Sequence, residues 1–394
     1  MKILFITPRF PYPPLRGDQV IPYYRLRTLG QKHEITILSF YEKPNELVGI
    51  KQIEPYCDAI YTVRLPKWQS LSNMAGGVFL SDLPLQVLYY RSSAFQTQLK
   101  IILEQNHFDL VHAFMLRIAP YVSTISAPKV IELIDSMQLN LERRLSMEPV
   151  TRRWLFQEEL RRIISYEQKI GDFFDRMIVV AEKDRALIKS DRVQVIPNGV
   201  DTNLFKPELK AQPNPVIIFS GNMGYAPNIN AVNWFVELCL PRIQQVIPSA
   251  SLIIAGANPN REMRGLERRG QITVTGFVDS MAETLNQASV AIAPMQSGSG
   301  IQNKILEAMA CELPVVTTTL GLGSIKAQPG QEILVADSPE SFADTLITLL
   351  QNPQLTKEIG QRARTFVIQN HSWEYGATQI EEVYNQILDR RSLD

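Results

Sequence analysis

The sequence predicts an α/β protein with two doubly wound domains, each built on a parallel sheet that helices cover on both faces. Short apolar segments alternate with longer helical ones along nearly all of the 394 residues, the pattern of parallel βα units. A chain of this length is too long for one ordinary domain and fits two. Residues 201–215 carry three prolines without apolar periodicity, so we predict a linker there and a domain boundary after residue 205.

The predicted strands form two series that are apolar on both faces, as in a sheet buried on both sides. The first series is Ile3–Thr7, Glu34–Ser39, Ala59–Val63, Leu110–His112, Val130–Ile134, Met177–Val180 and Val193–Ile196. The second series is Val216–Ser220, Leu252–Ala255, Ile272–Thr275, Val290–Ala293, Val315–Thr317 and Ile333–Val335. In such sheets ligands bind outside the carboxyl ends of the strands, so the loops at those ends are the candidate sites.

One long segment between the two series is helical. Residues 151–175 have apolar side chains at helical spacing with paired charges between them, which predicts an amphipathic helix. We favour a solvated, ion-paired face over a membrane-binding one for its polar side.

Composition excludes several classes of protein. Hydrophobic residues are 45% and charged residues 20%, an ordinary globular mixture, and 40 basic residues balance 40 acidic ones, which argues against a chain that coats nucleic acid. Cys57, Cys239 and Cys311 are far apart, so neither a zinc ribbon nor a disulfide framework is expected. Without a signal-peptide pattern or an apolar run of about 18–20 residues, the chain is expected to be cytoplasmic.

The most informative segment is SGSGIQNKILEAMACELPVV, residues 297–316. Its glycines allow close approach of a ligand, and free amides at the start of a helix predicted from Ile301 to Cys311 favour an anion such as a diphosphate. Lys304 adds a cation. Glu307 lies seven residues beyond Gly300, or about 10 Å along a helix, where its carboxylate could accept hydrogen bonds from ribose hydroxyls. The alternative is an ordinary strand, loop and helix with surface charges.

Three neighbouring segments favour the ligand-binding interpretation. VIPNGVDTNLF, residues 195–205, closes the first series with a strand, a turn and a polar loop. FSGNMGYAPN, residues 219–228, follows the first strand of the second series, where a glycine-rich turn can meet phosphate. TGFVDSMAETLNQASVAIAPM, residues 275–295, supplies a strand end with free backbone, suited to the edge of a nucleobase.

In this order the segments resemble the retaining nucleotide-sugar glycosyltransferases of family four, which have the GT-B architecture of two Rossmann-like domains facing a central cleft. The IPNGVD junction, the GFV turn, the K-x-x-E-A-M-A helix and the opening PRFPYPPLRGDQVIPYYRLRTLGQKHEITILSF carry the resemblance. The opening and the GIQNKILEAMA variant resemble a bacterial branch associated with exopolysaccharide and exosortase gene systems.

The resemblance implies a donor site. Glu307 would hold the ribose hydroxyls, Val278 would offer backbone hydrogen bonds to the base, and Gly17 would let the first loop close over the diphosphate. The backbone around three further residues would meet the sugar and the diphosphate: Ser299, Gly300 and Ile301. The expected donor-binding set also includes Asn198, Gly221 and Asn222.

Two departures from the family pattern affect this site. The usual E-x7-E motif would have a glutamate where this chain has Ser299, and a hydroxyl cannot supply charge to the donor sugar. The usual Arg and Lys after the first strand of the second domain are replaced by residues 222–228. The diphosphate charge would then be met by Lys304, by main-chain amides, or by an arginine such as Arg9 or Arg16.

The candidate catalytic residues of the first domain have structural interpretations as well as catalytic ones. His112 ends a predicted strand where the family often places a histidine on the donor sugar, but Phe114 occupies the second position of the usual H-x-H. A lone histidine there is more often structural. Asp135, with Ser136 beside it, and Asp18 could orient an acceptor hydroxyl or could equally cap helices.

Other motifs carry little. GLGS at residues 321–324 lacks the third glycine of a dinucleotide fingerprint, and no P-loop or HExxH motif is present. The resembled family does not normally require a metal, and no cofactor is expected beyond the donor. We expect His371 to start a terminal helix, with Trp373 in a packing position. The resemblance implies domains 1–205 and 206–375 and a helix at 376–394 that packs back on the first domain.

The expected activity is that of a retaining, metal-independent hexosyltransferase. It would move a sugar from a nucleoside-diphosphate sugar to a glycan, a lipid-linked acceptor or a small molecule, in the cytoplasm, with peripheral membrane contact left open. The alternatives are a nucleotide-sugar epimerase and a non-catalytic scaffold that binds nucleotide sugar, which the missing first glutamate supports.

Overall fold

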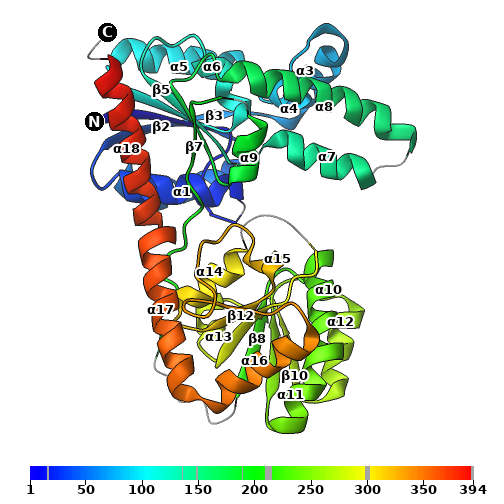
Figure 1. The fold of residues 1–394 in the computed structure, drawn as a ribbon. Helices are drawn as coiled ribbons and strands as arrows, with labels where there is room; N and C mark the ends of the chain where they lie inside the picture. Colours follow the sequence, from blue (N-terminus) through cyan, green and yellow to red (C-terminus); the bar gives the residue numbers. More distant parts are fainter. Residues whose placement is uncertain are drawn as a thin grey trace. The chain divides into compact units, whose positions relative to one another are not determined.

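The chain folds into two compact α/β units (Figure 1). The computed structural model describes residues 1–15, 17–134, 136–147, 150–188, 190–208, 215–297 and 302–391. Unit 1 comprises Met1–Asn198 and Gly376–Asp394, and unit 2 comprises Gly199–Tyr375. Unit 2 thus begins before the predicted boundary after residue 205, because Val200 pairs with Ser372 and belongs to the core of unit 2.

Within the described residues, unit 1 has a seven-stranded parallel sheet in the order β3-β2-β1-β4-β5-β6-β7. Every strand predicted for the first domain is present, with ends that differ by up to two residues. The strands are β1 (Lys2–Thr7), β2 (Glu34–Tyr41), β3 (Ala59–Arg64), β4 (Leu110–Phe114), β5 (Lys129–Ile134), β6 (Arg176–Val179) and β7 (Val193–Val195). The order reverses between β1 and β4, which makes their carboxyl ends the switch point where such sheets bind ligands.

Helices cover both faces of this sheet (Figure 1). They are α1 (Gly17–Leu29), η1 (Pro44–Gly49), α2 (Ile50–Ile53), η2 (Glu54–Tyr56), α3 (Lys67–Leu80), α4 (Leu85–Tyr89), α5 (Ser93–Gln105), η3 (Leu116–Ile118), α6 (Ala119–Val122), α7 (Met137–Met147), α8 (Val150–Ile170) and α9 (Glu182–Leu187). The amphipathic helix predicted at 151–175 is α8, which ends earlier, in a turn that starts at Gly171. Glu158 pairs with Arg161 and Arg162 on this helix, in line with an ion-paired solvated face.

A buried polar cluster joins four elements of unit 1. Arg25 on α1 donates to Glu132 on β5, with 2.9 Å between Nη2 and Oε1. His112 on β4 lies with Nε2 3.4 Å from Oε2 of Glu132 and Nδ1 2.6 Å from the Tyr384 hydroxyl of α18 (Trp373–Arg391). All four side chains are fully buried. Gly376 makes room for the guanidinium, because a Cβ there would lie 2.8 Å from Nη1 of Arg25.

The charges of this cluster are set by burial and by one another. Burial opposes ionisation of Glu132, but the Arg25 charge and the neighbouring His112 ring outweigh it and lower the pKa of Glu132 to about 2. Burial also lowers the pKa of His112, so its ring is neutral. Since an ionised carboxylate only accepts, we infer that Nε2 of His112 carries the proton toward Glu132 and that Nδ1 accepts from the Tyr384 hydroxyl. The cluster therefore fixes the last helix against the sheet with one compensated ion pair.

Within the described residues, unit 2 has a six-stranded parallel sheet in the order β10-β9-β8-β11-β12-β13. Every strand predicted for the second domain is present. The strands are β8 (Val216–Ser220), β9 (Ser251–Ala255), β10 (Ile272–Gly276), β11 (Val290–Ala293), β12 (Val315–Thr317) and β13 (Leu334–Val335). Here the order reverses between β8 and β11, so these two strands form the second switch point.

Helices again lie on both faces of the sheet (Figure 1). They are α10 (Ala226–Trp234), the π-helical turn η4 (Phe235–Cys239), α11 (Leu240–Val246), α12 (Arg261–Gly265), η5 (Leu266–Arg269), α13 (Met281–Leu285), α14 (Asn303–Ala310), α15 (Thr319–Leu322), α16 (Pro339–Gln351) and α17 (Pro353–His371). Among the described residues, no helix combines the length and the apolar character needed to cross a bilayer.

The junction before the last helix differs from the prediction. His371 ends α17 instead of starting a terminal helix, and α18 begins at Trp373. Ser372 separates the two helices in extended conformation, and its hydroxyl accepts from the Tyr375 amide, which caps the new helix. Trp373 is buried. A Cβ on Gly199 would lie 2.7 Å from the Trp373 backbone nitrogen, so this contact leaves room only for glycine.

We predict that Glu132→Ala destabilises unit 1 by about 3–5 kcal/mol, because it leaves the Arg25 charge buried without its partner. Chemical unfolding followed by circular dichroism measures the change. Asp344→Ala, which breaks the exposed ion pair with Arg242, is the control and is expected to cost at most about 1 kcal/mol. Equal losses for the two variants would contradict the role given to the buried cluster.

Candidate functional site

The predicted donor site falls at the switch point of unit 2, where β8 and β11 end. After β11 the chain leads to α14, which begins at Asn303, two residues later than predicted. Ser299, Gly300 and Ile301 lie outside the described residues. What the structure describes of this site is therefore α14 itself, the loop after β8 and the loop after β10.

Lys304 reaches from α14 to the loop after β8. Its ammonium donates to Oδ1 of Asn228, with 2.6 Å between the atoms, and lies 4.1 Å from the centre of the Phe219 ring. Asn228 is 6% exposed, and its Nδ2 donates to the Asn222 carbonyl at 2.9 Å. One side-chain amide thus holds both the cation and the loop. Asn228 belongs to the segment that replaces the family's basic residues, and only the structure shows this contact.

The loop after β8 is held tightly against the loop after β9. Gly221 donates to the Ala255 carbonyl, and Met223 donates to the Ala257 carbonyl. A Cβ on Gly256 would lie 1.9 Å from the Gly221 carbonyl oxygen, so this close approach requires glycine. Asn222 is exposed at the tip, where its side chain accepts from the Gly224 amide. The glycine-rich turn after β8 is therefore present, with Gly221 beside Lys304 and Asn222 linked to Lys304 through Asn228, and its phosphate-binding role stays a prediction.

Glu307 lies one turn after Lys304 on α14 and is half-buried. Among the described residues, no hydrogen-bond donor contacts its carboxylate. Burial raises the pKa of Glu307 to about 7, against the effect of the Lys304 charge. Burial likewise lowers the pKa of Lys304 to about 7, although Glu307 opposes it. Each group thus lies in a place that disfavours its charge, a common property of ligand and catalytic sites.

Val278 lies in the loop after β10, between the exposed Phe277 and Asp279. Within the described part of the chain, neither its amide nor its carbonyl has a hydrogen-bond partner. The free backbone that a nucleobase edge would need is therefore present at Val278.

In unit 1 the loop glycine and its neighbour lie at the first switch point. Gly17 begins α1, and Asp18 lies in the first turn of that helix. The Asp18 carboxylate lies 3.4 Å from Nε of Arg9 and 4.0 Å from Nη1 of Arg117, both of which follow strands of the sheet. Arg9, one of the predicted phosphate-binding arginines, is therefore already paired with a carboxylate inside its own unit.

The sequence predicts that His112 ends a strand, but His112 lies in the middle of β4 and is fully buried. The strand continues to Phe114, and the His112 ring stacks on Phe5 with 4.6 Å between ring centres. His112 is therefore part of the buried cluster, and its catalytic role stays a prediction.

Of the other residues predicted for the site in unit 1, two are described by the structure and two are not. Ser136 is buried, and its hydroxyl donates to Glu167. Asn198, the last residue of the first segment of unit 1, has a buried Oδ1 without a partner among the described residues. Arg16 and Asp135 lie outside those residues.

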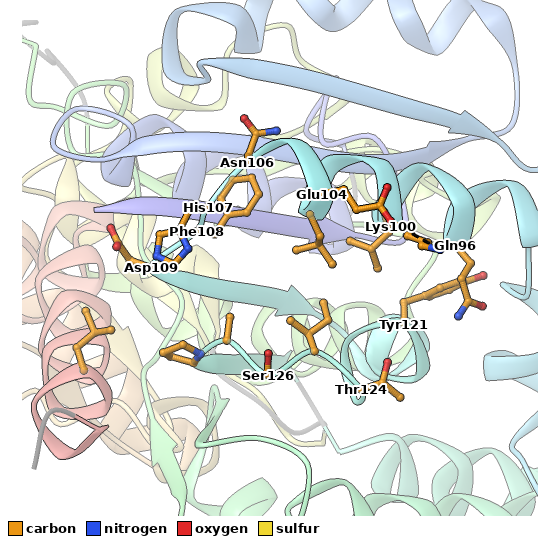
Figure 2. Close-up of a pocket in the computed structure, with 16 residues that line it drawn as sticks. Gln96, Lys100, Glu104, Asn106, His107, Phe108, Asp109, Tyr121, Thr124 and Ser126 are labelled. Atoms are coloured by element: carbon orange, nitrogen blue, oxygen red, sulfur yellow. Dashed lines mark ion pairs between the residues drawn. The ribbon is translucent and has the colours of Figure 1, made fainter. Parts of the chain in front are cut away.

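A cavity of about 780 Å³ lies at the edge of the unit 1 sheet where the strands begin, opposite the edge that holds the switch point (Figure 2). Residues that precede β4 and β5, such as His107, Asp109 and Ser126, line it together with α5, where Lys100 pairs with Glu104. Ligands of doubly wound sheets bind at the carboxyl ends of strands, and this cavity lies at the amino ends. The volume of this cavity is therefore not enough to make it the candidate ligand site of unit 1.

Part of the chain matches a known family model, and known proteins resemble the chain along its length. Residues 214–352 match the family model described as "Glycosyl transferases group 1". The chain is 23% identical over 392 residues to an uncharacterized 44.6 kDa protein in the cps region of Klebsiella pneumoniae, with 94% of this chain and 96% of that protein covered. It is 27% identical over 210 residues to phosphatidyl-myo-inositol mannosyltransferase of Mycobacterium leprae, a match that covers 50% of this chain and 54% of that protein.

Solved structures of similar fold align with nearly the whole length of this chain. Sucrose-phosphate synthase from Thermosynechococcus elongatus aligns with a TM-score of 0.65 and 17% identity over 99% of this chain and 100% of that chain. Anabaena Alr3699/HepE in complex with UDP aligns with a TM-score of 0.63 and 15% identity over 98% and 100% of the two chains. The predicted class, two Rossmann-like α/β domains of the GT-B type, is confirmed. The match to the glycosyl transferases group 1 model lies within unit 2, and several of the relatives are named glycosyltransferases.

We predict that Lys304 titrates near pH 7, because burial disfavours its charge. Glu307→Gln should move the titration to lower pH, since it removes the negative charge that supports the ammonium. The pH dependence of the Lys304 side-chain NMR signal, assigned with Lys304→Arg, measures both values. A titration near the ordinary 10.5 would show that α14 does not bury this amine.

Proposed function

We propose that this protein is a retaining glycosyltransferase that moves a sugar from a nucleoside-diphosphate sugar to an acceptor without a metal ion. The observation that carries the proposal is the half-buried Glu307 carboxylate, which no donor among the described residues contacts. It lies one turn from a Lys304 ammonium that is held over the loop after β8. Both lie at the switch point of the matched domain, where the ligand of a doubly wound sheet is expected.

In the proposed site, each part of the nucleotide meets a different group. The base would pair with the backbone of Val278, the ribose hydroxyls would donate to Glu307, and the diphosphate would meet Lys304 and the amides of the Gly221 loop. The printed title of the HepE structure names UDP as its ligand, and that of TarM from S. aureus also names UDP, which supports a nucleoside diphosphate as the ligand here.

Catalysis would come chiefly from stabilising the departing diphosphate. Negative charge grows on that group as the bond to the sugar breaks, and a fixed ammonium lowers the energy of this state without reorganisation. Asn228 holds the Lys304 ammonium in place before the reaction. Because a dianion favours protonated Lys304 while ribose hydroxyls favour ionised Glu307, we expect the proton that Lys304 takes up on nucleotide binding near neutral pH to be offset by one that Glu307 releases. Retention of configuration would follow from attack on the face from which the diphosphate leaves.

A non-catalytic nucleotide-sugar-binding scaffold is the second candidate, because Ser299 replaces the first glutamate of the family motif. A panel of nucleoside-diphosphate sugars scored by thermal shift, followed by hydrolysis of the stabilising donor, separates the two. Sugar release from that donor supports the enzyme, and stabilisation without turnover in the presence of acceptor extracts supports the scaffold.

We predict that Glu307→Ala weakens binding of the stabilising nucleotide by roughly 10- to 100-fold, since one hydrogen bond to a charged group contributes about 1.5–3 kcal/mol. Isothermal titration calorimetry measures the affinity. Glu283→Ala, which removes an exposed carboxylate of the same unit, is the matched control and should leave the affinity unchanged. Unchanged affinity in Glu307→Ala would refute the ribose-binding role.

We predict that Lys304→Ala lowers kcat by about 100-fold or more while it leaves binding of the free nucleoside unchanged, because the ammonium acts on the diphosphate alone. Asn228→Ala should lower kcat by a smaller factor, since it frees the ammonium without removing it. Steady-state kinetics and nucleoside titrations measure the two effects, with the exposed Lys357→Ala as control. Loss of nucleoside binding with an unaltered kcat would reverse the assignment.

A further inference from the structure

The cavity of Figure 2, of about 780 Å³, has features of a ligand site beyond its volume. It lies between α5, the loop from α6 to β5, and Leu388 of α18, all within unit 1. Figure 2 shows Gln96 and Tyr121 at one end of it and His107 and Asp109 at the other, so the cavity is elongated. Pockets that take drug-sized ligands are about 300–1,000 Å³, so a small molecule fits.

The floor of this cavity is the surface of the unit 1 core. Leu99, Phe108 and Tyr121 line it, and all three are buried members of the apolar cluster of this unit. Leu103 and Ile125 also line it, and they are partly buried and pack against the same cluster. A ligand with an apolar body would remove this surface from water.

One wall of the cavity is the loop from α6 to β5, and two cations hold this loop in place. Nζ of Lys129 donates to the carbonyls of Ser123, at 3.1 Å, and Ile125. Nη1 of Arg391 donates to the Ser126 carbonyl at 2.7 Å. Neither cation lines the cavity, so both bind the loop from outside it. Because hydrogen bonds from charged groups are the stronger ones, the loop is not free to close the gap.

The charges around the cavity balance. Among the described residues, three basic and three acidic side chains line the cavity, hold its loop or pair with a side chain that does. The basic ones are Lys100, Lys129 and Arg391, and the acidic ones are Glu104, Asp109 and Asp175. With His107 counted as neutral, their charges sum to zero, so neither an anion nor a cation is favoured. A neutral ligand has no charge to desolvate.

Hydrogen-bonding groups remain unused on the same loop. Thr124 and Ser126 line the cavity and are exposed. Within the described part of the chain, neither hydroxyl has a hydrogen-bond partner. A hydroxyl both donates and accepts, so the apolar body of the ligand can carry one or two neutral polar groups.

Tyr121 connects the cavity with the carboxyl edge of the sheet. Its hydroxyl accepts from the Ser92 amide at 2.7 Å and donates to the Tyr90 carbonyl at 2.6 Å. The Tyr90 ring centre lies 5.5 Å from the guanidinium carbon of Arg117, and Nη1 of Arg117 lies 4.0 Å from the Asp18 carboxylate. A ligand that displaces the Tyr121 ring therefore acts on Tyr90 and Arg117 through a continuous chain of contacts.

We propose that the cavity of Figure 2 binds a neutral, largely apolar small molecule and that this molecule acts through Tyr121 on Arg117 at the switch point of unit 1. The ligand is an effector, because it binds away from the carboxyl ends of the strands, where ligands of doubly wound domains bind. The site is separate from the nucleotide site proposed in unit 2, and the proposal does not rest on that site.

Fluorescence titration of the full chain tests the binding. The probes are N-phenyl-1-naphthylamine, which is neutral, and 8-anilinonaphthalene-1-sulfonate, which adds a negative charge to the same rings. We expect one site per chain, with a Kd at least tenfold lower for the neutral probe. Thr124→Trp, which fills the cavity from its wall, should raise that Kd at least tenfold, and Ser126→Phe is a second filling variant.

Thr97→Trp is the matched control, because Thr97 is exposed on α5 and does not line the cavity. It should leave the Kd unchanged, and circular dichroism checks that each variant folds. Absence of binding, preference for the sulfonate, or equal affinity in the filling variants and the control would overturn the proposal.

The NMR signal of the Arg117 Nε–H group, assigned with Arg117→Lys, tests the effect at the switch point. We expect it to shift when the neutral probe saturates the wild type. Tyr121→Phe keeps the ring but removes both hydrogen bonds of the hydroxyl, so it should bind the probe within about twofold and lose the shift. A signal that stays in place in the wild type, or shifts equally in Tyr121→Phe, would refute the action through Tyr121.

Discussion

Parallel strand pairing places the carboxyl ends of all strands of a sheet at the same edge, and the chemistry of both units depends on this constraint. In unit 1 it brings together the residues that follow β1, β2 and β4, which are far apart in the sequence. In unit 2 it brings the loop after β8 beside the start of α14. The helices that cover the sheets bury the strands but leave these edges free. Side chains with opposite charges and unused hydrogen-bonding capacity gather there.

Within unit 2, the side-chain amide of Asn228 holds the charged end of Lys304 beside the loop after β8. Asn228 accepts from Lys304 and donates to the Asn222 carbonyl, so the ammonium and the loop cannot move independently. Burial weakens the charge of Lys304, and that of Glu307 in the same way, until a ligand compensates both. A ribose that donates to the carboxylate and a diphosphate that accepts from the ammonium would meet these two needs together. In the proposed site, Lys304 with Asn228 as its neutral anchor would take the place of the basic residues that the resembled family has after this strand.

The sequence predicted every strand of both sheets, because buried parallel strands are short apolar runs that contrast with the helices between them. It also placed Lys304 and Glu307 one turn apart on the same helix, since their relative positions follow from helical spacing, while their roles stay predictions. It did not predict the contact of Lys304 with Asn228 or the burial of His112 under Tyr384, because each joins elements that the sequence keeps far apart. The predicted strand ended two residues too early, so the sequence did not show that His112 lies in the middle of β4 and is fully buried.

A crystal structure of the full chain with the stabilising nucleoside diphosphate would test the central claim most directly. The account predicts both ribose hydroxyls within hydrogen-bond distance of the Glu307 carboxylate, about 2.5–3.0 Å, and the diphosphate beside the Lys304 ammonium. A nucleotide bound elsewhere, with Glu307 still free of any donor, would contradict it.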